Sequence, residues 1–300
     1  MIQKIIHQTG PTNKQIWHPL WNKCQSSWKQ EFPTFEYRFW SDEEIDDLIK
    51  SNYAEYYQTY SEFPVHIMKI DFIRFCIMHS FGGIYCDLDF FCYKNFGNYI
   101  KSPKNSVWLV ENPFGNDPIE NSLMISSEPG HPFWLDCMNT SIKRFNETKT
   151  FRKKNLDDIS IISSDKQYGM KLRPHLVFHL TGTNLISSVY RKWRNKPNTL
   201  INTLSGRLFN NLDTAYFPEI ITRHCHTGVW GKENLKIIEE NNNKHYDSIR
   251  GIPLHDFDFY TDYSNGQYIK TNEILHQMMN WDRNDIDGVP ELESTEFTYC

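Results

Sequence analysis

The sequence lacks the paired cysteines of disulfide-rich domains and zinc knuckles. Its seven cysteines are odd in number, lie scattered along 300 residues and include no Cys-x-x-Cys pair. This pattern argues against a disulfide framework and against a structural zinc site. It favours a reducing compartment, in which thiols stay free.

The sequence also lacks long apolar runs and an excess of basic charge. No run of about 18 apolar residues occurs, so we expect no membrane span. Residues 1–7 have neither the apolar core nor the small-residue cleavage site of a signal peptide. A formal net charge of −5 disfavours a general nucleic-acid binder. These absences predict a cytoplasmic protein with no nucleic-acid partner.

What the chain does have is length and alternating secondary structure. Its 300 residues are enough to bury a sizeable core. Apolar periodicity predicts strands over residues 3–7, 37–40, 106–110 and 121–126, and helices over 17–30, 41–51, 64–80, from 132 onward and up to 193. The alternation predicts an α/β fold with a Rossmann-like, mostly parallel sheet flanked by helices. We assign residues 1–240 to one domain and 241–300 to a polar C-terminal extension packed on it.

The chain is organised around an Asp-x-Asp sequence, Asp87 and Asp89, which follows Gly82-Gly83 and an apolar run. In an extended segment, residues i and i+2 point to the same side, so both carboxylates can face one point. Like charges so close favour a shared divalent cation with oxygen ligands. The alternative is a surface turn with two solvated aspartates. The apolar flanks favour the end of a buried strand, and the glycines indicate a tight turn or a close backbone approach.

Asp71 and Arg74 lie three residues apart within the apolar helix predicted over residues 64–80. They share one face of that helix, and charges inside a buried helix need partners. One interpretation is a mutual ion pair that fixes the helix to the sheet. The other is that both side chains face a cleft and bind a polar ligand.

Four further residues are candidates with a structural alternative. Trp40 ends a predicted strand and either packs in the core or stacks on a flat ring. Gly182 precedes a predicted helix, whose N-terminus either binds an anion or simply follows a loop. His224 and His226 would share one side of a strand, either as metal ligands or as structural residues.

Four segments, taken in order, resemble one family. They are Lys4-Ile5-Ile6-His7-Gln8-Thr9, Tyr37-Arg38-Phe39-Trp40-Ser41-Asp42, Lys69-Ile70-Asp71-Phe72-Ile73-Arg74 and Gly82-Gly83-Ile84-Tyr85-Cys86-Asp87-Leu88-Asp89. The set resembles the glycosyltransferases with a DXD-containing sugar-binding region. These include yeast mannosyltransferases and bacterial capsular sugar transferases, and are distantly similar to the large clostridial toxin glucosyltransferases. The likeness covers roughly the first 140 residues well and continues weakly beyond them.

The resemblance implies an enzyme with a GT-A fold that uses Mn²⁺ or Mg²⁺. It would move a hexose from a UDP- or GDP-linked donor to a hydroxyl of a glycan, lipid or protein, with retention at the anomeric carbon. Because no enzymic nucleophile is evident in the sequence, we favour a front-face mechanism. A haloacid-dehalogenase-like phosphatase is disfavoured by Phe90 after the second aspartate. The alternative from another class is a catalytically silent module that binds sugar nucleotides or acts as a lectin.

The resemblance also implies roles for the matching residues. Asp89 is expected to ligate the metal directly, and Asp87 to reach the ribose or donor sugar and the metal's water shell. Asp71 and Arg74 are expected to hold the donor sugar and diphosphate. The loop expected beside the base and ribose consists of His7, Gln8 and Thr9.

The family's late motif is matched in part by residues 224–230, His-Cys-His-Thr-Gly-Val-Trp. The first histidine, His224, the glycine and Trp230 are kept, so Trp230 is expected to contact the donor. Val229 replaces the usual serine and removes a hydroxyl contact. His226 stands where an aromatic residue is usual, which leaves open whether His224 or His226 faces the metal.

Overall fold

A computed structural model describes residues 2–63, 66–97, 100, 103–112, 119–154, 177–197, 200–210, 220–225 and 227, with backbone alone for 148–154. The predicted extension over residues 241–300 lies outside these ranges, as do His226 and Trp230. The division of the chain at residue 240 therefore stays a prediction.

A six-stranded sheet forms the centre of the fold, in the order β2-β1-β3-β6-β5-β7. Only β6 runs antiparallel to its neighbours, and the β1–β2, β1–β3 and β5–β7 pairs are parallel. The predicted mostly parallel α/β sheet is thus confirmed. The strands are β1 (Ile5–Thr9), β2 (Glu36–Trp40), β3 (Gly83–Cys86), β5 (Ser106–Glu111), β6 (Ile119–Ser126) and β7 (Leu200–Leu204).

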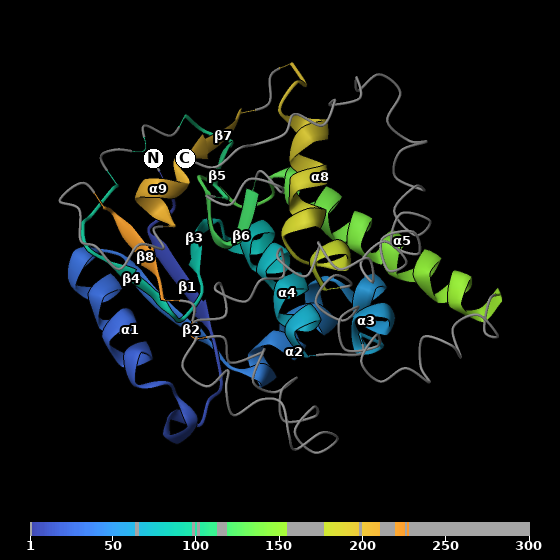
Figure 1. The fold of residues 1–300 in the computed structure, drawn as a ribbon, viewed down its shortest axis with the longest axis horizontal. Coiled ribbons are helices and arrows are strands. Elements are labelled where there is room, and N and C mark those ends of the chain that lie inside the picture. The colour runs from blue at the N-terminus through green and yellow to red at the C-terminus, as the bar shows by residue number, and fades with distance from the viewer. Residues whose placement is uncertain are drawn as a thin grey trace, which may run out of the picture. The chain divides into compact units, whose positions relative to one another are not determined.

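Helices cover both faces of the sheet (Figure 1). One face carries α2 (Asp42–Asn52), α3 (Ala54–Ser61), α4 (His66–Phe81), α5 (Pro132–Lys154) and α8 (Thr183–Trp193). The other carries α1 (Pro19–Glu31), which follows the short 3₁₀ helix η1 (Lys14–Ile16), together with α9 (Gly206–Phe209) and a ribbon of β4 (Phe90–Cys92) with β8 (Thr222–His224). Each face therefore has its own apolar core.

Local sequence signals explain most of these elements. Ser41 and Glu44 form the predicted capping box at the start of α2, each side chain bonding the other's backbone N–H. The helix α3 was not evident in the sequence, because its buried residues are Tyr56 and Tyr60 rather than aliphatic side chains. In the described part of the chain, no helix combines the length and apolar character needed to cross a membrane.

Gly82 and Gly83 turn the chain from α4 into β3, as their pairing in the sequence indicated. Gly82 ends α4 with φ +63° and donates its N–H to the carbonyl of Met78 at 3.0 Å. Gly83 has φ +85°, and a Cβ there would collide with the backbone carbonyl oxygen of Ile5 in β1. Only glycine satisfies both the left-handed conformation and this close approach. The turn aims β3, and the aspartates after it, along the sheet beside β1.

We predict that Gly83→Ala lowers the free energy of unfolding by about 3 kcal/mol, because a positive φ and a backbone clash both act on the new Cβ. The matched control is Gly130→Ala, where φ is also positive at +80° but a Cβ would meet no atom within 4 Å. That control should cost only about 1 kcal/mol. Equal losses in urea denaturation would show that the clash with Ile5 is not the cause.

Candidate active site

The two aspartates lie in a tight turn between β3 and β4. The N–H of Phe90 donates to the carbonyl of Asp87 at 3.1 Å, which closes the turn. Ligand atoms of Asp87, Asp89 and His224 all lie within 4.8 Å of one another. The two carboxylates therefore converge as predicted, but through a turn rather than through the side-to-side alternation of a strand.

A buried guanidinium ties this turn to α4. Arg74 contacts Asp71 Oδ1 through Nη1 and Asp87 Oδ1 through Nη2, both at 2.9 Å. Its Nε donates to the hydroxyl of Tyr85 at 3.0 Å, and that hydroxyl in turn donates to Asp87 Oδ1 at 3.0 Å. The side chains of Asp71 and Arg74 are each 5% exposed. One arginine thus holds a structural carboxylate on one side and a carboxylate of the turn on the other.

Both carboxylate oxygens of Asp71 bind groups of the protein. Its Oδ1 also accepts from Asn121 Nδ2 at 3.1 Å, and its Oδ2 accepts from Thr181 Oγ1 at 3.2 Å. Of the two interpretations left open by the sequence, the geometry favours the ion pair between Asp71 and Arg74. A direct contact of Asp71 with the donor sugar stays a prediction. The burial of the Asp71 side chain disfavours such a contact.

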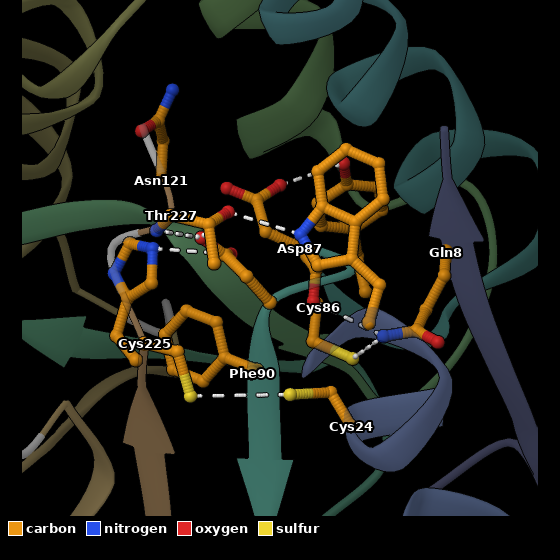
Figure 2. Close-up of polar contacts among 12 residues, drawn as sticks. Gln8, Cys24, Cys86, Asp87, Phe90, Asn121, Cys225 and Thr227 are labelled. Carbon is orange, nitrogen blue, oxygen red and sulfur yellow. Dashed lines mark hydrogen bonds and ion pairs between the residues drawn. The ribbon is translucent and has the colours of Figure 1, made fainter. Parts of the chain in front are cut away.

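Asp89 is held by the last residue of β8 and by the segment that follows it. Its Oδ1 lies 3.3 Å from His224 Nε2, and its Oδ2 accepts from the backbone N–H and the hydroxyl of Thr227 at 3.0 and 3.1 Å. The ring of His224 stacks on Phe90 with 4.4 Å between centroids. Figure 2 shows Asp87 and Thr227 on opposite sides of this site, with Phe90 beneath. The pairing of β4 with β8 therefore brings His224 to the aspartates.

The charges of the site are out of balance. Asp71 and Asp87 share the guanidinium of Arg74, and Asp89 adds a third carboxylate, so these four residues carry an excess of two negative charges when all are ionised. Burial raises the pKa of Asp87 to about 6, with Asp89 adding to the rise and Arg74 opposing it. Burial alone would lower the pKa of His224, but the Asp89 carboxylate beside it raises that pKa above its usual value. Two carboxylates and an imidazole with excess negative charge fit a divalent cation.

Side chains of β1 form hydrogen bonds with the segment that contains β3 and the acidic turn. Gln8 donates from Nε2 to the carbonyl of Asp87 at 3.1 Å, and Thr9 shares a hydrogen bond of 2.9 Å with the Tyr85 hydroxyl. His7 bonds the carbonyl of Gly82 through Nε2, and burial lowers its pKa to about 4. All three side chains are buried in a strand. The resemblance implied a loop here, and that was wrong, because the three residues belong to β1. Their place beside the base and ribose stays a prediction, and the contacts that the structure shows for them are with the protein itself.

Trp40 and Gly182 also have structural surroundings. The indole of Trp40 is 1% exposed, donates to His7 Nδ1 at 3.2 Å and has the guanidinium carbon of Arg38 3.6 Å from its ring centroid. This favours core packing over stacking on a ligand ring. Gly182 precedes α8, where a Cβ would lie 3.0 Å from the Cα of Phe178. The glycine is thus explained by close packing, and anion binding there stays a prediction.

Several site residues were not singled out from the sequence as site residues, because their types are common in cores and loops. They are Tyr85, Asn121, Thr181 and Thr227. Tyr85 looks like one more apolar residue of a strand, and Thr181 lies 110 residues away from the Asp71 it contacts. Of the two candidate histidines, His224 lies beside the two aspartates, and His226 lies outside the described residues.

Comparison with known proteins agrees with this geometry. Residues 19–112 match the family model described as the glycosyltransferase sugar-binding region containing the DXD motif. The chain is 29% identical over 198 residues to inositol phosphoceramide mannosyltransferase 3 of Schizosaccharomyces pombe, covering 65% of this chain and 47% of the relative. It is 33% identical over 147 residues to mannosyl phosphorylinositol ceramide synthase CSH1 of Saccharomyces cerevisiae, covering 49% and 37%.

Among solved structures, the PaToxG glycosyltransferase is similar over 64% of this chain and 69% of its own, with 14% identity and a TM-score of 0.45. The chain spans less than half the length of the two yeast relatives. What those whole proteins do therefore bears on this chain only as a basis for proposals.

We predict that Asp71→Ala lowers the free energy of unfolding by about 3–5 kcal/mol, because it leaves the buried Arg74 without one of its two carboxylate partners. The control is Asp46→Ala, which breaks an exposed i,i+4 pair with Lys50 and should cost less than about 0.5 kcal/mol. Chemical denaturation of both variants checks the difference. A small loss for Asp71→Ala would mean that the ion pair is not structural.

We predict that Mn²⁺ binds more weakly as the pH falls from 8 to 5. A ligand carboxylate must be deprotonated, and the pKa of Asp87 is about 6, so Asp87 alone weakens binding about tenfold at pH 5. The raised pKa of His224 acts in the same direction, since a protonated imidazole cannot bind a metal. Calorimetric titration of the chain with Mn²⁺ measures this, and a constant affinity across the range would contradict the ligand assignment.

Proposed function

We propose that this chain, which belongs through residues 19–112 to the glycosyltransferases with a DXD sugar-binding region, transfers a hexose from a nucleotide sugar to a hydroxyl group. The observation that carries the proposal is the convergence of Asp87, Asp89 and His224 on one turn at the sheet edge. The mostly parallel sheet flanked by helices is the architecture expected of a GT-A fold.

The ligand set for Mn²⁺ or Mg²⁺ consists of Asp89 and His224, with Asp87 either as a ligand or through the metal's water shell. When bound, such an ion neutralises the charge that develops on a departing nucleoside diphosphate. The excess of two negative charges in the set of Asp71, Arg74, Asp87 and Asp89 supports this assignment.

Arg74 acts as a positioning residue in this proposal. It is 4% exposed, and its two terminal nitrogens form ion pairs with Asp71 and Asp87. Its fixed charge keeps the neighbouring carboxylate of Asp87 oriented, and Asp87, Tyr85 and Asp71 together raise the pKa of Arg74 against the effect of burial. The guanidinium therefore stays charged in the site throughout the working pH range. Direct contact of Arg74 with the donor diphosphate is part of the family's pattern and is proposed here on that basis alone.

A front-face reaction is supported by how the site carboxylates are used. Asp71 accepts hydrogen bonds from groups of the protein on both oxygens, and Asp87 and Asp89 belong to the ligand set. None of these three is then available to attack the anomeric carbon. In the proposed reaction the acceptor hydroxyl attacks on the side from which the nucleoside diphosphate leaves, and the departing phosphate takes the hydroxyl proton.

The names of the relatives suggest the sugar and the acceptor. Both yeast relatives are named for mannosyl transfer to inositol phosphoceramide or mannosyl phosphorylinositol ceramide synthesis. We therefore propose mannose as the first hexose to test, with a lipid-linked or glycan hydroxyl as the acceptor. Both belong to this chain only as proposals.

The test is release of nucleotide from GDP-mannose, UDP-glucose and UDP-galactose with Mn²⁺ present. We expect slow hydrolysis of one donor, and expect Asp89→Asn to reduce it by about 100-fold or more, since losing a ligand costs at least as much as losing an outer-shell partner. Asn keeps an oxygen that can accept from Thr227, so the variant should stay folded.

The control is Asp46→Asn, which alters an exposed carboxylate of α2 and should leave the rate unchanged. Binding of a donor without nucleotide release, for every donor and acceptor tried, would favour the silent sugar-nucleotide-binding module. Failure of every donor to raise the melting temperature with Mn²⁺ would contradict the proposal altogether.

A further inference from the structure

A pair of thiols lies beside the candidate active site, and one of them belongs to the residue that directly follows His224. Cys24 of α1 and Cys225 after β8 approach to 3.9 Å between sulfur atoms, although 201 residues separate them in the chain. Figure 2 shows the two sulfurs pointing toward each other beneath Phe90. Nothing in the sequence indicates this pair, because the two cysteines are brought together only by the fold.

The pair is accessible from one side. Both cysteines line a cavity of about 270 Å³, which is also lined by Lys23 and Arg223. Among the six cysteines in the described part of the chain, five are buried and Cys225 is half-buried. Cys225 is therefore the more exposed of the two thiols to an oxidant entering this cavity, and Cys24 lies within 3.9 Å of it. The two cationic side chains favour an anionic oxidant.

Cys225 belongs to the segment that completes the metal-ligand set. It follows His224 directly, and its N–H donates to the carbonyl of Asp89 at 2.9 Å. Two residues further on, Thr227 bonds the Asp89 carboxylate and also accepts from Trp21 Nε1 of α1 at 3.0 Å. The helix α1 therefore meets this segment at two points, one of them the thiol pair.

We propose that Cys24 and Cys225 form a reversible disulfide that fastens the segment carrying His224 to α1. The oxidant is an anionic small disulfide of the glutathione type. Cys225 gives up its proton to water, and its sulfur attacks one sulfur of the oxidant, forming a mixed disulfide and releasing one thiolate, which takes up a proton. The sulfur of Cys24, losing its own proton, then attacks Cys225, forming the internal S–S bond and releasing the second thiol.

The bond has a defined consequence for the site. It closes a loop of about 200 residues between α1 and β8, and such closure restricts the unfolded chain and any state in which the segment has detached. The hydrogen bonds from Cys225 and Thr227 to Asp89 should then open less often. The inference goes beyond the proposed transfer reaction, and its test needs neither a sugar nucleotide nor a metal.

The test begins with the full chain treated with oxidised glutathione, followed by blocking of free thiols and peptide mapping by mass spectrometry. We expect a linked peptide containing Cys24 and Cys225, which disappears on treatment with dithiothreitol. The oxidised chain should melt about 5 °C or more above the reduced chain. Hydrogen exchange at the N–H groups of Cys225 and Thr227 should be about tenfold slower in the oxidised chain.

Single-residue variants distinguish a disulfide between Cys24 and Cys225 from modification of other thiols. Cys24→Ser and Cys225→Ser should each abolish the linked peptide and the rise in melting temperature, and Cys24→Ser should retain glutathione on Cys225. The matched control is Cys92→Ser, which alters a buried thiol of β4 and should keep the full response of the pair.

Two results would overturn the proposal. One is a wild-type chain that gains glutathione at Cys225 without forming the linked peptide. The other is a linked peptide with unchanged hydrogen exchange at Cys225 and Thr227, because the bond would then not fasten the segment. Both readings remain informative if the chain transfers no sugar, since neither depends on a donor or an ion.

Discussion

The rest of the site depends on the buried guanidinium of Arg74. It lies between Asp71 on its own helix and Asp87 on the turn after β3, with 2.9 Å to each. An unpaired charge at this depth is strongly destabilising, so the three side chains must be placed together. Since Arg74 projects from α4, this requirement fixes α4 against the end of β3 and sets the direction in which Asp87 faces.

The direction of β6 explains how so many elements reach the same edge of the sheet. Asp87 follows the carboxyl end of β3, which is where ligands bind in sheets of this kind. Because β6 runs antiparallel to β3, its beginning lies at that same edge, and Asn121 near its start reaches Asp71. A backbone hydrogen bond also joins the two strands at this edge, because the N–H of Asp87 donates to the carbonyl of Ser122 at 2.9 Å.

What the sequence could predict was whatever depends on local pattern. The capping box of α2, the glycine turn before β3 and the alternation of strands and helices were all read correctly, because neighbouring residues determine them. Contacts between distant segments could not be read in this way. The bond from Thr181 to Asp71 and the thiol pair span 110 and 201 residues, and the sequence suggested free thiols with no partner. Even the convergence of Asp87 and Asp89 was expected from the wrong geometry, a strand instead of a turn.

The ligand set itself is assembled across the chain, and this couples its formation to the docking of one segment. Asp89 belongs to the turn after β3, whereas His224 arrives only when β8 pairs with β4. Docking places N–H and O–H donors of Thr227 on the Asp89 carboxylate, which reduces its repulsion with Asp87. A bound cation would also reduce the repulsion between the carboxylates of Asp87 and Asp89. Any group that neutralises the acidic turn therefore stabilises the docked segment, and any contact that holds the segment, such as those made by α1, prepares the turn for a cation.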